Sequence, residues 1–207
     1  MKYLVRTPKI ISKLIFPGYV WDMEDAGNRL FLTFDDGPHP EATPYVLDLL
    51  KEYQARATFF CIGKNVRLYP EIYKRIILEG HKTGNHTMNH LNGWKTDDAI
   101  YLKNVVEASQ YIDTNLFRPP YGRIGAFQAK QIKEALGLKI IMWTVLSGDF
   151  DRTISAAQCW QNIKSKTREG SIVVFHDSEK AMPRMRQALK DTLEYFSEKK
   201  MQFDSIS

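Results

Sequence analysis

The chain has 207 residues, of which 43% are hydrophobic and 26% charged. This length and composition are typical of one globular domain with a sizeable core, and no low-complexity run interrupts it. The net charge of +5 comes largely from Lys2, Arg6, Lys9 and Lys13, because the first 20 residues contain no acidic residue. The rest of the chain is nearly balanced, which argues against a nucleic-acid-binding protein, whose basic residues should be spread over a binding face.

Residues 1–28 are interpreted as a basic arm that packs on or leads into a domain at 29–207. The apolar run from Ile10 to Phe16 is short, is interrupted by Lys13 and is followed by Pro17-Gly18. No cleavable export signal is therefore expected, and no stretch approaches the roughly 20 apolar residues of a spanning helix. The default expectation is a cytoplasmic protein, with weak contact between this run and a membrane surface left open.

Apolar residues from Leu30 to Phe34 predict a strand that ends at Asp35-Asp36, where Gly37-Pro38 turns the chain. Neighbouring side chains at a strand end point in different directions. One carboxylate can therefore bind a cation while the other faces whatever the cation holds. The alternative is a turn with two solvated aspartates.

The remaining chain alternates between helical periodicity and short apolar runs. Further strands are expected at 57–62, 81–85, 116–118, 139–145, 171–175 and 201–206, and helices at 43–53, 70–80, 96–113, 127–135, 155–166 and 182–196. The two cysteines, Cys61 and Cys159, match no metal spacing and no disulfide framework. The alternation predicts an α/β fold of about seven parallel strands with crossover helices.

Both a closed or nearly closed barrel and an open doubly wound sheet fit this alternation. Chemically distinctive residues follow at least five of the strands, and the loops after barrel strands gather at one rim. The barrel is therefore favoured. These residues are Asp35-Asp36, His86, Arg118-Pro119, Asp149 and His176.

His86 and His90 stand four residues apart, so a helical turn would project both imidazoles to the same side. Adding one carboxylate gives two nitrogen ligands and one oxygen ligand, which leaves positions open for water and substrate. The alternative is a pair of histidines that cap or hydrogen-bond a loop.

The segment Arg118-Pro119-Pro120-Tyr121 predicts a stiff loop, because two prolines fix its backbone. A rigid loop suits an arginine that holds a carboxylate, and a backbone N–H aimed at developing negative charge. A surface turn with a solvated arginine is the alternative. His176 follows an apolar strand and is suited to proton transfer, since its ordinary pKa is about 6.5. A core histidine is the alternative.

Together these residues resemble the polysaccharide deacetylase family, also called the NodB homology domain or carbohydrate esterase family 4. The resemblance runs from about Leu30 to the C-terminus and includes five motifs in the family's order. They are Thr33–Pro38, His86–His90, Arg118–Tyr121, Trp143–Phe150 and Val174–His176. For the fold, the resemblance implies a distorted barrel of about seven parallel strands.

The resemblance also implies a role for each matching residue. Asp35 would be the general base, held by Arg118, and His176 the acid, oriented by Asp149. A divalent metal ion would bind Asp36, His86 and His90, with zinc the first expectation and cobalt or nickel also acceptable. The backbone N–H of Tyr121 would contact the oxyanion, and Tyr121, Phe150 and Val174 would line the substrate pocket.

The fourth motif departs from the family pattern at two positions. Leu146 stands where many members carry an additional aspartate, and Phe150 stands where they carry tryptophan. Asp149 still matches the aspartate that orients the acid, so activity is expected. The smaller ring of Phe150 puts the substrate preference in question.

The activity implied is metal-dependent removal of N-acetyl groups from a glycan of the chitooligosaccharide or peptidoglycan type, with release of acetate. One alternative is an O-acetyl esterase acting on a polysaccharide such as acetylxylan. A second is a catalytically silent carbohydrate-binding module.

Overall fold

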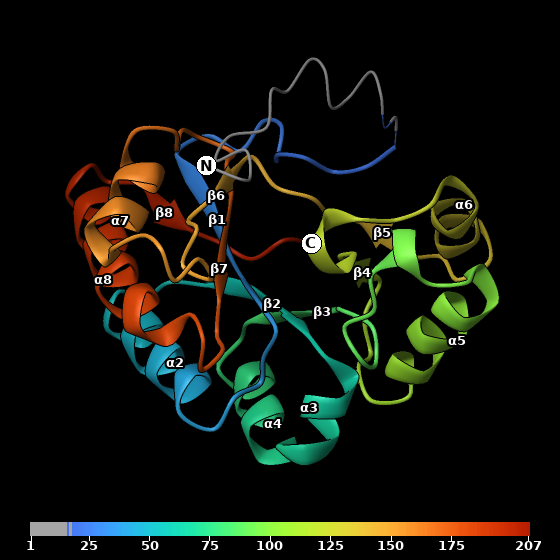
Figure 1. The fold of residues 1–207 in the computed structure, drawn as a ribbon. Coiled ribbons are helices and arrows are strands. Elements are labelled where there is room, and N and C mark those ends of the chain that lie inside the picture. The colour runs from blue at the N-terminus through green and yellow to red at the C-terminus, as the bar shows by residue number, and fades with distance from the viewer. Residues whose placement is uncertain (1–15, 17) are drawn as a thin grey trace.

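A computed structural model describes residue 16 and residues 18–207. Its central element is β1 (Arg29–Asp35), which pairs in parallel with β2 (Ala57–Cys61) on one side and β7 (Ile172–His176) on the other. The sheet continues in the order β5-β4-β3-β2-β1-β7-β6 and curls into a half-barrel (Figure 1). Its remaining strands are β3 (Lys82–Asn85), β4 (Leu116–Phe117), β5 (Lys139–Ile140) and β6 (Val145–Leu146). The expected fold of about seven parallel strands is confirmed.

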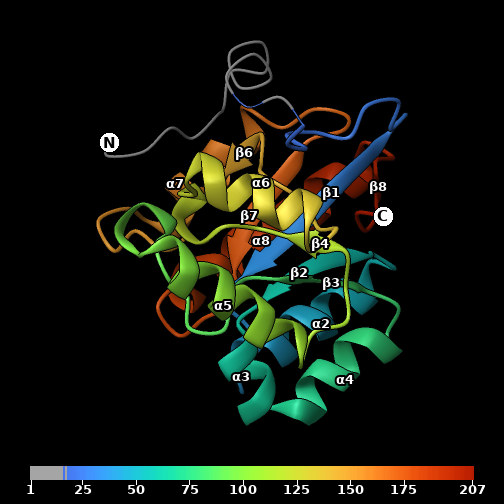
Figure 2. The ribbon, with the colours of Figure 1, turned by 90° about the vertical axis from the view of Figure 1, so that its right-hand side faces the viewer.

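Helices surround the outer face of this half-barrel (Figure 1). Figure 2 views the molecule from the side of α5 and α6, which lie in front of the sheet. The helices are α2 (Ala42–Glu52), α3 (Gly63–Leu68), α4 (Pro70–Leu78), α5 (Asp98–Ser109), α6 (Ala126–Glu134), α7 (Ala156–Lys164) and α8 (Met182–Glu198), with the short 3-10 turns η1 (Gly93–Lys95) and η2 (Pro120–Gly122). Strand side chains that point outward pack against one another and against the apolar faces of the helices in one buried cluster. Within it, Phe34 of β1 stacks between Phe59 of β2 and Phe175 of β7 at ring distances of 5.0 and 5.8 Å.

Side chains on the inner face form layers that rise from an apolar base to a polar edge. Alternation along β1 turns Phe31, Thr33 and Asp35 inward. The base contains Phe31, Ile172 and Ile206, and the Ile206 N–H donates to Thr58 Oγ1 at 2.9 Å. A last strand, β8 (Gln202–Phe203), pairs with the start of β1 and brings the C-terminus to the middle of the ring (Figure 1). The amino ends of the strands are thus plugged, while their carboxyl ends carry the polar residues.

The N-terminal segment spans the gap between the two ends of the sheet. Val20 forms a parallel bridge with Ile141, just after β5, and Asp22 an antiparallel bridge with Ser171, just before β7. Trp21 between them is 6% exposed. Residues 18–28 therefore pack on the domain, whereas the four basic residues of the arm and positions 10–15 lie outside the described residues. No helix in the described part of the chain is long and apolar enough to cross a membrane.

Some predicted elements differ from those observed. The single strand expected at 139–145 is two strands, because Ile140 and Met142 bond to Val20 between them. The helix expected at 96–113 spans only Asp98–Ser109, since the Asp97 side chain caps it. Helix α3 was not predicted. Helix α2 begins at Ala42, so Thr43 lies inside the helix and does not cap it. The Thr43 hydroxyl donates to the Asp177 carboxylate instead.

Candidate active site

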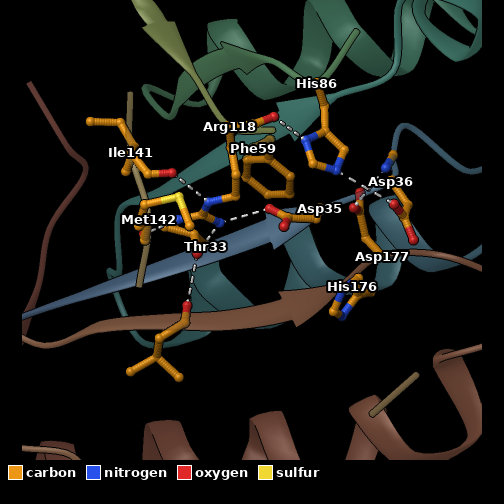
Figure 3. Close-up of polar contacts among 12 residues, drawn as sticks. Thr33, Asp35, Asp36, Phe59, His86, Arg118, Ile141, Met142, His176 and Asp177 are labelled. Carbon is orange, nitrogen blue, oxygen red and sulfur yellow. Dashed lines mark hydrogen bonds and ion pairs between the residues drawn. The ribbon is translucent and has the colours of Figure 1, made fainter. Parts of the chain in front are cut away.

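The end of β1 sends two neighbouring carboxylates in different directions (Figure 3). Asp35 is the last residue of the strand and points inward, where it is 4% exposed. Asp36 follows with a positive φ of 82°, so its side chain leaves the plane of the strand. The Asn65 side chain donates to the Asp36 carbonyl at 2.7 Å and holds this turn in place.

Arg118 lies in the centre of the half-barrel and is fully buried. Its Nη1 donates to Asp35 Oδ1 at 2.7 Å and to Thr33 Oγ1 at 2.8 Å. Its other nitrogens donate to the carbonyls of Ile141 and Met142, and its guanidinium lies 4.0 Å from the centre of the Phe60 ring. Every direction of the planar group is thereby fixed. Asp35 cannot rotate without breaking the buried ion pair.

The two histidines converge on Asp36 without forming a helical turn. Thr87 and His90 have φ of 65° and 57°, so a loop with left-handed residues, and not a helical turn, brings the rings together. The Nε2 atoms of His90 and His86 lie 3.2 and 3.9 Å from Asp36 Oδ1. The three ligand atoms lie within 4.8 Å of one another.

This cluster fits a metal ion. Ligands about 2.1 Å from a tetrahedral ion are roughly 3.4 Å apart, which lies between the distances of 3.2 and 3.9 Å from Asp36 Oδ1 to the two imidazoles. Asp36 Oδ1 is buried, and among the residues that the structure describes it faces only the two imidazoles, without accepting a well-directed hydrogen bond. A buried carboxylate oxygen held in this way is expected where a cation binds.

The protonation of the cluster also suits a cation. Burial lowers the pKa of His86 to about 4, so the ring is neutral at pH 7. Its Nδ1 lies 2.7 Å from the Arg118 carbonyl, and donation there leaves Nε2 free to act as a ligand. Burial alone would raise the pKa of Asp36, but nearby His90, His176 and His86 outweigh it and the pKa is lowered.

His176 stands on the opposite side of Asp35 from Arg118's loop, as its register partner on β7. Its Nδ1 lies 2.7 Å from Asp149 Oδ1, and its backbone N–H donates to Asp149 Oδ2 at 2.8 Å. Burial works against a charged ring, but the charge and hydrogen bond of Asp149 dominate and raise the pKa of His176 to about 9. The imidazole is therefore a charged proton donor at neutral pH, fixed in orientation by a fully buried carboxylate.

The three residues expected to line a pocket differ in exposure. Tyr121 has a φ of 61° after two prolines, is 61% exposed, and its ring lies 4.6 Å from that of His90. Phe150 contacts His176 edge-on at 5.1 Å. Val174 is only 1% exposed and lies two residues before His176 on the same face of β7, so it is buried beneath that histidine.

The sequence interpretation did not single out Asp177, which is fully buried behind the site. Its carboxylate accepts the Gly37 N–H at 3.1 Å and the Thr43 hydroxyl at 2.5 Å, and burial raises its pKa to about 8. A Cβ on Gly37 would lie 2.1 Å from Asp177 Oδ2, so only glycine fits. The signal available in the sequence was the position of Asp177 next to His176. Through these contacts, the Asp177 side chain ties the turn that carries Asp36 to the end of β7.

The family pattern of polysaccharide deacetylases matches residues 22–141, more than half of the chain. The chain belongs to the polysaccharide deacetylase family. A peptidoglycan-N-acetylglucosamine deacetylase of Bacillus cereus is 34% identical over 197 residues, with 92% of each chain covered. A chitooligosaccharide deacetylase of Azorhizobium caulinodans is 33% identical over 157 residues, covering 72% of this chain and 74% of that one.

Solved structures agree with this membership. One is a peptidoglycan N-acetylglucosamine deacetylase in complex with 4-naphthalen-1-yl-N-oxidanyl-benzamide. It superimposes with a TM-score of 0.87 at 30% identity and covers 97% of this chain and 95% of that chain. The predicted family and the predicted fold are therefore both confirmed. The structural match extends over nearly the full length of the chain.

Proposed function

We propose that this protein is a metal-dependent deacetylase that hydrolyses N-acetyl groups of a glycan of the peptidoglycan or chitooligosaccharide type. One observation carries the proposal. Asp35 and His176 are neighbours across β1 and β7, and both adjoin the cluster of Asp36, His86 and His90. A base, an acid and a cation site thus meet at one edge of the sheet, a combination that suits metal-assisted hydrolysis of an amide.

Asp36, His86 and His90 would hold a divalent ion, for which zinc is our first choice because imidazole and carboxylate ligands suit it. Such an ion supplies a Lewis acid and makes a bound water acidic enough to react near pH 7. The neutral state of His86 supports this assignment, as does the buried Asp36 Oδ1, which accepts no well-directed hydrogen bond from the described residues.

Asp35 would accept the proton of the attacking water. Its Oδ1 is bonded to Arg118, which leaves Oδ2 as the oxygen for proton transfer. Because Arg118 is fixed by four further contacts with the protein, Asp35 keeps its orientation through the reaction. Such preorganisation lowers the barrier to reaction, because Asp35 does not have to rearrange to reach the transition state.

His176 would donate a proton to the nitrogen of the leaving amine. The carboxylate of Asp149 keeps the Nδ1 proton in place, so Nε2 is the donor that faces the substrate. The raised pKa of His176 keeps the ring charged at neutral pH. The amine leaves as a neutral group, and acetate is the second product.

Two residues would shape the space for the acetyl group. The Tyr121 backbone N–H, aimed by its prolines and positive φ, would donate to the developing oxyanion, and loss of one such donor typically costs roughly 3–4 kcal/mol. The Phe150 ring, beside His176, would contact the acetyl methyl group above the floor made by Val174.

The test is acetate release from N-acetylglucosamine oligomers, intact peptidoglycan and acetylxylan, with and without a chelator. Release from an N-acetylated glycan, abolished by chelation and restored by zinc, cobalt or nickel, is the expected result. Release from acetylxylan alone would favour the O-acetyl esterase. Oligomer binding with no release from any of the three would favour a silent carbohydrate-binding module.

A further inference from the structure

Two loops that carry site residues continue side by side away from the proposed catalytic centre. They begin at the contact between His90 and Tyr121, whose rings are 4.6 Å apart. Three residues further along, the Gly93 N–H donates to the Arg123 carbonyl at 3.2 Å. The two segments, 90–94 and 121–124, therefore form one continuous surface that starts at the site.

Trp94 lies at the far end of this surface and is 64% exposed. Single exposed apolar side chains are common and need no explanation, so exposure alone decides nothing. What distinguishes Trp94 is that it is both exposed and immobilised. Its Nε1–H donates to the Ile124 carbonyl at 2.9 Å, and the Arg123 guanidinium lies 5.2 Å from the centre of its ring.

The loop beneath Trp94 is also fixed. Gln128 is 1% exposed, and its Nε2 donates to the Gly93 carbonyl at 2.9 Å and to Asp98 Oδ1 at 2.9 Å. A Cβ on Gly93 would lie 2.6 Å from the Arg123 carbonyl oxygen, so the two loops approach as closely as glycine permits. The indole is thus held in one place before any ligand arrives, which lowers the entropic cost of binding.

We infer that Trp94 forms a sugar-binding subsite that holds a glycan residue neighbouring the one that is deacetylated. The C–H groups on the face of a pyranose ring are weakly positive and pack against the negative face of an aromatic ring. The guanidinium of Arg123 lies over the indole ring, and because Trp94 is nevertheless 64% exposed, part of its ring surface remains available to a ligand. Since four residues span at most about 14 Å, Trp94 is within reach of an oligosaccharide bound at His90.

This inference rests on the proposed function and specifies its substrate. The glycan is an oligomer or polymer, because a single acetylated sugar in the site would leave Trp94 without a ligand. Trp94 is therefore a residue for chain-length preference and takes no part in the chemistry.

Two measurements test the subsite. The first compares kcat/KM for N-acetylglucosamine oligomers of two and five residues. Trp94→Ala should lower the value for the pentamer roughly five- to tenfold more than for the dimer. Trp94→Phe keeps a ring but loses the hydrogen bond to the Ile124 carbonyl. Its kcat/KM for the pentamer should lie between those of Trp94→Ala and the native protein. Leu78→Ala is the matched control, since Leu78 is 74% exposed at the end of α4, away from the site.

The second measurement is calorimetric binding of the pentamer to Asp35→Asn, alone and combined with Trp94→Ala. A fivefold or greater loss of pentamer affinity in the double variant supports the subsite even if the protein shows no turnover. This measurement therefore separates failure of the subsite from failure of the proposed function. The inferred subsite would be overturned by equal pentamer affinity of the two variants or by no pentamer binding to Asp35→Asn. It would also be overturned if Trp94→Ala lowered kcat/KM equally for dimer and pentamer.

Discussion

Replacement of Arg118 by methionine is the sharpest test of the buried ion pair in the site. The substitution keeps an unbranched apolar side chain of similar length but removes the charge and every donor. Asp35 would then remain ionised and 4% exposed with no cation beside it. The carbonyls of Ile141 and Met142 would lose their donors as well.

The expected loss is large because both partners are buried. Breaking a buried pair by removing one member typically costs 3–5 kcal/mol, since it leaves an uncompensated charge inside the protein. For a chain of this size, roughly 2–4 °C of Tm corresponds to 1 kcal/mol, so Arg118→Met should unfold about 6–20 °C below the native protein. Adding Asp35→Asn should recover part of the loss, because the double variant buries no charge at this position.

The assay is thermal and urea unfolding of the four proteins of this double-mutant cycle. Arg75→Met is the control, because Arg75 also pairs with carboxylates, those of Asp48 and Glu79, but at the surface. Exposed pairs are worth about 0–1 kcal/mol, so this variant should unfold close to the native protein. The reasoning is refuted if Arg118→Met is destabilised no more than Arg75→Met, or if the double variant is less stable than Arg118→Met.

Further predictions concern turnover, metal binding and the pH dependence of activity. Asp35→Asn should lower kcat for acetate release by about 10²–10⁴ while leaving zinc affinity largely intact, and normal turnover would reject Asp35 as the base. His90→Ala should weaken zinc binding to the chelator-treated protein in a titration, whereas unchanged affinity would remove His90 from the ligand set. The native kcat/KM should fall as pH rises through about 9, where His176 loses its proton. In Asp149→Asn this fall should move to lower pH, because the charge that raises the pKa is gone, and an unmoved profile would contradict that cause.

The architecture was predictable because the strands are short apolar runs separated by periodic helices. The continuous run Ala57–Cys61 and the run Ile172–Phe175 could be read from composition alone. The division of 139–145 into two strands could not, since it depends on Val20, which is more than a hundred residues away in the sequence. Tertiary hydrogen bonds decided this boundary, and local propensity had no influence on it.

The site was predictable to the extent that its residue types are unusual. Asp35, Arg118 and His176 were identified from sequence, and the structure brings them together. The way in which His86 and His90 converge was not predictable, because it depends on left-handed residues in a loop that is held by Asn104 of α5. Asp177 was overlooked because a buried carboxylate that bonds to a backbone N–H leaves no periodic pattern in the sequence.

The plug at the amino ends of the strands has a consequence for turnover. Below Arg118 the interior is filled by Phe31, Ile172 and Ile206, so it offers no passage from one side of the ring to the other. Acetate formed beside Asp35 must depart through the same opening that admits the glycan. Both products therefore have to leave before the next sugar chain can occupy the site.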